Sequence, residues 1–160
     1  MKDAADMARW AARDFVFNLE ALPADRLDWK PSPEAKSALQ LAGEVAGVAG
    51  NTVPVLQGGD WTPAPLPHPA TLQEARQLVL ERTEAYAAAL EAANPASLRR
   101  TLDLPFGKFW AARFVLFPVI DLIHHRGQLC YLQSLVGDAE VRFDPEASDQ
   151  FFNPPGASGA

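Results

Sequence analysis

Apolar residues recur at helical spacing along four long stretches of this chain, and segments rich in proline and glycine separate these stretches. The spacing predicts helices over residues 3–22, 38–57, 71–93 and 109–136. Helices of about 20 residues that are apolar along one side must bury those sides against one another. The sequence therefore predicts an all-α protein whose fold is a four-helix bundle around one core.

Capping residues support two of the predicted helix starts. Ser37 precedes the second helix as an N-cap, and Thr71 is followed three residues later by Glu74, which is the pattern of a capping box. Pro118 falls within the fourth helix, so we expect an irregularity there. The connection before that helix reads as extended, with a short strand at residues 99–104.

A chain of 160 residues is long enough for one domain with a sizeable core and short for two. We therefore expect a single domain over residues 1–160, with the bundle at about 3–137. Residues 138–160 are rich in proline, glycine and serine towards their end. They are predicted to form a surface tail that Val141 and Phe143 anchor.

Charge disfavours several classes of partner. The 14 basic and 20 acidic residues give a net charge of −6, whereas nucleic acid and anionic membrane surfaces attract clustered Lys and Arg. The first residues carry charges where a signal peptide needs an apolar run, and no stretch is long and apolar enough to span a bilayer. We therefore expect a cytoplasmic protein that binds neither nucleic acid nor membrane.

The predicted fourth helix carries polar residues in its apolar stripe. Asp121 and His125 are four residues apart and project from one face, with Gln128 close to the same stripe. Polar groups on a buried face need partners, and a metal ion satisfies a carboxylate and an imidazole together. A buried hydrogen-bonded pair of aspartate with histidine or arginine satisfies them as well, so the spacing leaves both interpretations open.

The predicted second helix contains a similar anomaly. Glu44 lies in an apolar run that contains Gly43, Gly47 and Gly50, and Asn51 follows close to the same face. Glycine lowers helix stability by roughly 1 kcal/mol per position relative to alanine, so three glycines indicate a close neighbour, either another helix or a ligand. The alternative for Glu44 is a solvated helix face.

Three segments of the chain resemble the DinB-like (DinB/YfiT) superfamily of small four-helix bundles. The segment DLIHHRGQLCYLQSLVGD is similar to the closing helix of that family, in which H-x-x-H-H-R-G-Q is the usual form. The segments LDWKPSPEAKSALQLAGEVAG and LPFGKF are similar to its loop into the second helix and to the start of its last helix. The resemblance covers most of the chain and implies a bundle of DinB/YfiT-like topology.

Members of this family commonly bind one divalent metal through three histidines, one from the second helix and two from the last. The resemblance places Glu44, Asp121 and His125 at these three positions, so only His125 keeps the usual residue. His124 precedes it in the motif and points about 100° away, so it is not expected to be a ligand.

Two carboxylates and one imidazole would thus stand where the family has three imidazoles. Oxygen ligands shift the preference from zinc and nickel towards harder ions such as manganese, iron(II) or magnesium. Asn51 and Gln128 are expected near this site, with Gln128 as a partner of a ligand. In the rival interpretation the site has lost its metal, and Glu44 and Asp121 share a proton or pair with an arginine.

The resemblance implies a class of activity. Relatives include metal-dependent transferases and isomerases that use low-molecular-weight thiols such as bacillithiol or mycothiol. The implied function is metal-dependent thiol S-transfer, or a related isomerase or hydrolase reaction, on a small molecule that the sequence does not identify. The alternative is a non-catalytic, stress-related binding or scaffold protein whose variant site holds no metal. The resemblance also implies a homodimer.

Overall fold

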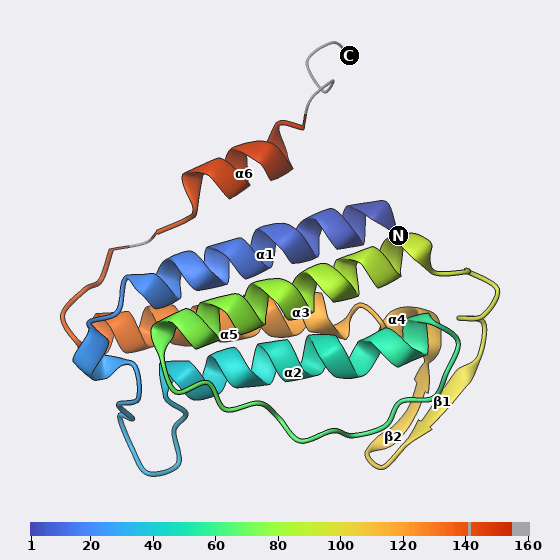
Figure 1. The fold of residues 1–160 in the computed structure, drawn as a ribbon, viewed down its shortest axis with the longest axis horizontal. Coiled ribbons are helices and arrows are strands. Elements are labelled where there is room, and N and C mark those ends of the chain that lie inside the picture. The colour runs from blue at the N-terminus through green and yellow to red at the C-terminus, as the bar shows by residue number, and fades with distance from the viewer. Residues whose placement is uncertain (141, 155–160) are drawn as a thin grey trace.

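The computed structural model describes residues 1–140 and 142–154, and this part of the chain contains four long helices that lie side by side (Figure 1). They are α1 (Lys2–Glu20), α2 (Ala38–Leu56), α3 (Leu72–Ala92) and α5 (Phe117–Leu135). α1 packs against α3 and α5, and α2 packs against the same two helices. This arrangement confirms the predicted all-α four-helix bundle.

Side-chain caps begin α2 and α3. Ser37 Oγ accepts a hydrogen bond from the Gln40 backbone N–H at 3.3 Å, and Gln40 Oε1 accepts one from the Ser37 N–H at 3.1 Å, which completes a capping box. Thr71 Oγ1 accepts from the Glu74 N–H at 3.1 Å. The Glu74 carboxylate reaches one residue further back and accepts from the Ala70 N–H. The predicted starts of both helices are therefore confirmed.

Buried apolar side chains form two clusters. Phe15 and Leu122 belong to the first cluster, and Tyr86 and Val115 belong to the second, which also receives side chains from the hairpin region. Tyr86 has no exposed surface, and its Oη donates a hydrogen bond to the Val115 backbone oxygen at 2.5 Å. Burial raises the pKa of the Tyr86 hydroxyl well above its usual value.

The close neighbour of the glycines in α2 is the proline-rich loop that connects α2 to α3 and runs along α2 in Figure 1. A Cβ atom added at Gly43 would clash with the Pro67 carbonyl, and one added at Gly47 would lie 2.5 Å from a methyl group of Leu66. Gly50 instead faces the Arg82 side chain of α3. Glycine at positions 43 and 47 lets the loop backbone approach the helix.

A hairpin and a short helix connect α3 to α5. β1 (Thr101–Leu104) pairs antiparallel with β2 (Gly107–Trp110), and α4 (Ala111–Phe114) follows directly. The strand expected at residues 99–104 is β1. Gly107 has a φ of +136°, a backbone conformation that residues with a Cβ rarely adopt, and it closes the turn of the hairpin.

The prediction of one helix over residues 109–136 was wrong at its beginning. Residues 109 and 110 belong to β2, and the chain breaks again after α4 before α5 begins at Phe117. Pro118 has no backbone N–H to donate, so it fits the first turn of a helix and not its interior. The irregularity expected at Pro118 is therefore the start of α5.

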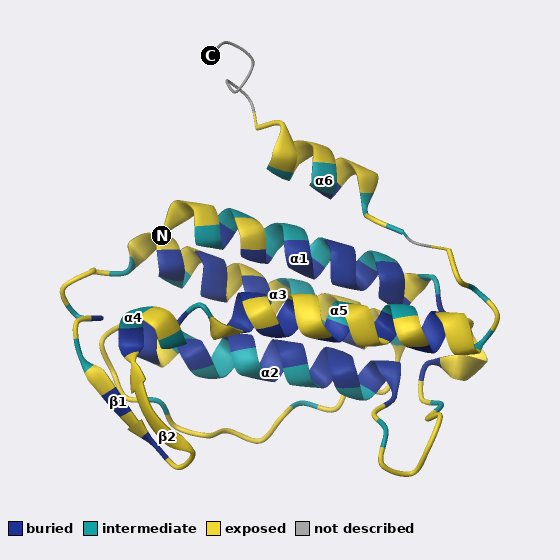
Figure 2. Ribbon diagram, turned by 180° about the vertical axis from the view of Figure 1, so that it is seen from behind, coloured by how far each residue is buried: buried dark blue, intermediate teal, exposed yellow. Residues whose placement is uncertain are grey.

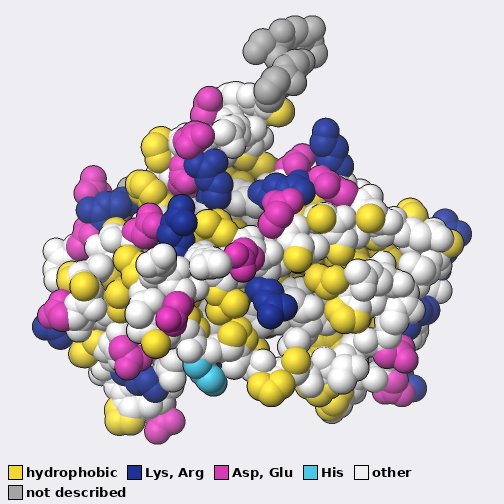
Figure 3. Space-filling view, in the orientation of Figure 1, with side chains coloured by type: hydrophobic (Ala, Val, Ile, Leu, Met, Phe, Trp, Pro, Cys, Tyr) yellow, Lys and Arg dark blue, Asp and Glu magenta, His cyan; other side chains and the backbone are white. Residues whose placement is uncertain are grey.

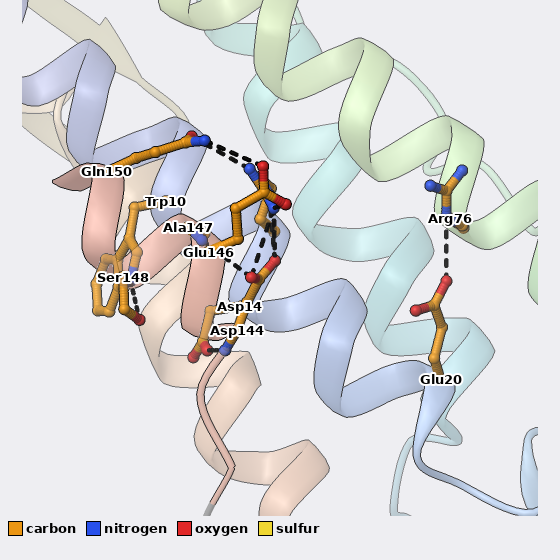
Figure 4. A network of polar contacts seen from close by, with 10 residues as sticks. Trp10, Asp14, Glu20, Arg76, Asp144, Glu146, Ala147, Ser148 and Gln150 are labelled. Carbon is orange, nitrogen blue, oxygen red and sulfur yellow. Dashed lines mark hydrogen bonds and ion pairs between the residues drawn. The ribbon is translucent and has the colours of Figure 1, made fainter.

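The tail contains α6 (Pro145–Phe152), a helix that the sequence pattern does not predict, and α6 packs against α1 (Figures 1 and 4). The Trp10 ring of α1 stacks on Phe151 with ring centroids 5.3 Å apart, and its Nε1 donates to Ser148 Oγ at 3.3 Å. Arg13 forms ion pairs with Asp144 and Glu146 on the same side.

Of the two predicted anchors of the tail, Val141 lies outside the described residues. The Phe143 ring lies under the Arg126 guanidinium of α5, at 4.3 Å from the guanidinium carbon to the ring centroid. Arg126 in turn forms an ion pair with the buried Asp14 of α1 at 2.7 Å. The start of the tail is thus held between α1 and α5.

α5 exposes a row of large apolar side chains, and exposed parts of this helix face the viewer in Figure 2. The row consists of Phe117, Ile120, Ile123, Tyr131 and Leu135. On the face drawn in Figure 3, basic side chains are interspersed with acidic ones. None of the helices in residues 1–140 and 142–154 combines the length and the hydropathy needed to cross a bilayer.

Candidate metal centre

The packing of α2 against α5 brings together the three residues that the sequence singles out. Asp121 and His125 lie one turn apart on the buried face of α5, and Glu44 lies opposite them on α2. The side chains of Glu44, Asp121 and His125 expose 21%, 10% and 5% of their surface. Two carboxylates and an imidazole therefore share a region that is largely shielded from water.

The Nε2 atom of His125 is the point at which the three side chains meet. It lies 3.3 Å from Asp121 Oδ1 and 3.6 Å from Glu44 Oε2. The other ring nitrogen, Nδ1, lies 2.6 Å from Gln128 Oε1. When Nδ1 carries the proton, the Nδ1–H group donates a hydrogen bond to Gln128 Oε1, and the lone pair of Nε2 faces the carboxylates. A second proton, on Nε2, makes the ring a cation.

Opposing effects act on the pKa of His125. Burial disfavours the charged ring and is the largest single influence. The hydrogen bonds to Asp121 and Gln128, together with the negative charges of Asp121 and Glu44, outweigh burial and raise the pKa above its usual value. The imidazolium form can therefore balance one of the two carboxylates when no other cation is present.

The second carboxylate oxygen of Asp121 has no hydrogen-bond partner among the described residues. Asp121 Oδ2 is buried and accepts no hydrogen bond from the residues that the structure describes. Leaving a buried polar atom unpaired costs about 1–3 kcal/mol, and more when the group is charged. The other oxygen of the same carboxylate, Oδ1, lies 3.3 Å from His125 Nε2, so Oδ2 is an unused ligand atom within the cluster.

The three side chains have donor types that bind divalent cations, and two of the distances between them can be compared with those in a metal site. Two donors bound to one metal at about 2.1 Å lie roughly 3.0–3.4 Å apart, which is close to the two distances measured from His125 Nε2. Within the described ranges, however, no three Cys, His, Asp or Glu side chains are arranged as a ready-made metal site. The cluster therefore contains donor atoms that suit a divalent cation, but these atoms are not arranged around one ion position.

Lys36 is one reason why the three side chains do not form a ready-made metal site. Its ammonium contacts Oε2 of Glu44, the oxygen that also faces His125. Lys36 precedes the Ser37 cap of α2, so it lies at the end of the long connection from α1. An ammonium on this carboxylate competes with any other cation for Oε2 of Glu44.

A groove opens beside the three residues. Its volume is about 260 Å³, and it is lined by Pro31, Glu34, Ala35, Lys36, Leu41, Gln128, Tyr131 and Leu132. Two of these side chains also contact the cluster, since Lys36 binds Glu44 and Gln128 binds His125. A small molecule in the groove would therefore lie next to the cluster.

The remaining residues named from the sequence have separate positions. His124 is exposed, with its ring edge-on to that of His125 at 4.9 Å between centroids. Asn51 lies two turns beyond Glu44 along α2, and among the described residues it forms no hydrogen bond with the cluster. Gln128 is the predicted neighbour that contacts a ligand residue.

Lys36 and Tyr131 were missed from the sequence. Lys36 belongs to a proline-rich connection whose path no periodicity reveals, and Tyr131 is one of several aromatic residues on α5. The one available signal was the Ser37 cap, because it places the preceding residue at the start of the helix that carries Glu44.

Comparisons with known proteins agree with this architecture. A DinB-like protein (YjoA) from Bacillus subtilis has a similar crystal structure, with a TM-score of 0.70 and 20% sequence identity. The match covers 88% of this chain and 96% of the other, and at this identity it concerns the fold. No curated protein matches the chain significantly. The sequence profile described as the DinB superfamily matches residues 7–129, and this chain therefore belongs to the DinB superfamily.

Proposed function

We propose that the protein binds one divalent cation through Glu44, Asp121 and His125 and acts as a metal-dependent transferase of a low-molecular-weight thiol. The observation that carries the metal part is the buried Oδ2 of Asp121, which has no hydrogen-bond partner among the described residues. It belongs to the carboxylate whose Oδ1 lies 3.3 Å from His125 Nε2, and this nitrogen also faces Glu44 Oε2 at 3.6 Å. The thiol part rests on the resemblance to relatives that use such thiols.

Each residue has a role in this proposal. Glu44 and Asp121 supply two negative charges, and His125 supplies a neutral nitrogen at Nε2. Gln128 Oε1 accepts a hydrogen bond from the Nδ1–H group of His125, and this bond keeps Nε2 directed at the carboxylates. This oxygen-rich set favours manganese, iron(II) or magnesium over zinc and nickel. A divalent cation bound there supplies Lewis acidity, which lowers the pKa of a thiol or a water molecule.

The groove next to the cluster is the place for the small-molecule substrate or the thiol cosubstrate. Leu41 and Leu132 give it an apolar wall, which limits the access of water to a bound thiolate. Gln128 and Lys36 provide polar groups on the side of the cluster. The homodimer and the cytoplasmic location implied by the sequence stay predictions.

One observation favours the second candidate, a non-catalytic binding or scaffold bundle without metal. Lys36 already neutralises Glu44, and a protonated His125 would neutralise Asp121. Such a cluster is balanced in charge without any ion. This candidate predicts that the purified protein carries no metal and gains none on exposure to divalent ions.

Elemental analysis distinguishes the two candidates. The protein is purified without a polyhistidine tag and without chelator, next to a triple variant Glu44→Ala, Asp121→Ala, His125→Ala. A matched triple variant, Asp25→Ala, Glu81→Ala, His68→Ala, removes the same kinds of side chain from exposed positions.

We expect about one equivalent of a divalent metal in the wild type and the matched control and almost none in the cluster variant. Thiol transfer to a fluorogenic electrophile should then require both the metal and the intact cluster. A wild-type protein that remains metal-free after soaking in manganese, iron(II), zinc and nickel salts would contradict the proposal and favour the scaffold.

A further inference from the structure

The charges around Glu44 indicate a role for Lys36 beyond the metal centre itself. In the present arrangement two carboxylates face one imidazole and one ammonium, and the ammonium is on Glu44. A divalent cation would bring two positive charges to the same place. Lys36 and the cation would then repel each other and compete for the Glu44 carboxylate.

The side chain of Lys36 can change its position without disturbing the fold. The next residue, Ser37, is fixed, because it caps α2 and its Oγ donates to Asp28 Oδ1 at 3.0 Å. The Lys36 side chain is 49% exposed and carries its charge on a flexible four-carbon stem. Its side chain also lines the groove, so rotation about its own bonds is enough to turn the ammonium from Glu44 into that space.

We propose that Lys36 is the internal counter-ion of Glu44 in the cation-free protein, and that a bound divalent cation releases it into the groove to bind the carboxylate of a small anionic ligand. This inference rests on the proposed function. A groove of about 260 Å³ is suited to a ligand of small size. Leu41, Tyr131 and Leu132 can pack against a short aliphatic chain. Lys36 is the basic side chain of a lining that also contains Glu34, and it recognises the charge at the end of the ligand.

The first test measures competition for Glu44. Isothermal titration with Zn²⁺, a diamagnetic probe ion, compares the wild type with Lys36→Met. Lys30→Met serves as the control, because it removes the same charge from an exposed position in the same connection. Removing the competing ammonium should tighten zinc binding about tenfold in Lys36→Met and leave it nearly unchanged in Lys30→Met.

The second test measures recognition of the anion. Ligand-observed NMR follows butyrate and its neutral analogue butyramide on zinc-loaded protein. The wild type and Lys30→Met should bind butyrate at least about tenfold more tightly than butyramide, and Lys36→Met should lose this preference. Butyrate held directly by the metal would instead keep its preference in Lys36→Met, which overturns the assignment of Lys36.

The outcomes separate the two proposals. If none of the proteins binds zinc, manganese, iron(II) or nickel, both the proposed function and this inference are wrong. If zinc binds with equal affinity to the wild type and Lys36→Met, the metal centre stands and the role of Lys36 is wrong. Circular dichroism of each variant confirms that the bundle is intact before the comparison is made.

Discussion

Gln128 holds the imidazole of His125 from the side opposite the carboxylates. The distance of 2.6 Å between His125 Nδ1 and Gln128 Oε1 indicates a strong hydrogen bond. We expect Gln128→Leu to weaken binding of a divalent cation by about tenfold or more, because the ring loses the acceptor that fixes its tautomer. Equilibrium dialysis against zinc measures the change.

His124→Ala tests the other contact of Gln128, because His124 exposes its ring to solvent while its Nε2 lies 3.3 Å from Gln128 Nε2. Its affinity for zinc should equal that of the wild type. A loss in His124→Ala as large as that in Gln128→Leu would show that His124 takes part in the site.

Tyr86 is the largest side chain with no exposed surface, and its hydroxyl has one hydrogen bond, to the Val115 carbonyl between α4 and α5. Tyr86→Phe keeps the ring and removes that bond, which leaves the carbonyl unpaired. We expect the free energy of unfolding to fall by about 1–2 kcal/mol. Urea denaturation measures it, and an unchanged midpoint would mean that water replaces the hydroxyl.

The sequence could identify the cluster only because three polar residues interrupt apolar stripes. Asp121 and His125 stand out by their spacing on one helix, but nothing in the spacing relates them to Glu44, which is 77 residues away from Asp121. The family resemblance supplied that relation. The contact of Lys36 with Glu44 depends on the path of an irregular loop, so neither periodicity nor motif could reveal it.

At the level of helices, Arg9 joins α1 to α3 through ion pairs with Glu84 and Glu91, at 2.9 Å and 2.7 Å. The hydrogen bond from Arg9 is the main cause that lowers the pKa of Glu91 below its ordinary value of 4.5. A lowered pKa in the folded state means that the pair stabilises the fold above that ordinary value. This stabilisation is lost as the pH falls through the folded-state pKa.

We therefore expect Arg9→Met to lose less stability than the wild type when the pH is lowered from about 5 to 3. Urea denaturation at several pH values provides the free energies of unfolding. Arg26→Met, which removes an arginine paired only with its neighbour Asp25, should follow the wild-type curve. Parallel curves for all three proteins would mean that the Arg9 pairs contribute nothing measurable.

The elements themselves were predictable where apolar periodicity is long. Three helices begin and end within about two residues of the predicted positions, in part because Ser37 and Thr71 are recognisable N-caps of α2 and α3. The second strand of the hairpin, β2, was missed because Phe109 and Trp110 also continue the apolar pattern of the helix that follows. α6 is short and owes its position to Trp10 and Arg13 of α1, which its local sequence does not show.

For the whole molecule, the cluster joins two helices that the chain connects only through α3 and the hairpin. Glu44 is on α2, whereas Asp121 and His125 are on α5. A cation bound by all three would stabilise only the folded state, by about 2.7 kcal/mol at a concentration one hundred times the dissociation constant. For a domain of this size that corresponds to a rise in Tm of roughly 5–10 °C.

Thermal unfolding with and without added manganese or zinc measures this rise. The triple variant Glu44→Ala, Asp121→Ala, His125→Ala should show no rise, although its Tm without metal can differ from that of the wild type. An equal rise in both proteins would mean that the ion binds elsewhere on the surface.

The loop that lies against the glycines of α2 has an evolutionary consequence. A residue larger than glycine at position 43 would meet the Pro67 carbonyl, so it could be accepted only together with a change that moves the loop outwards. Among related sequences, a larger residue at position 43 should therefore occur together with a change that reroutes this loop, and a larger residue at position 47 together with a smaller one at position 66. Because Gly43 adjoins Glu44, such joint changes fall next to the carboxylate, and they would mark the lineages in which a change in the cluster is most to be expected.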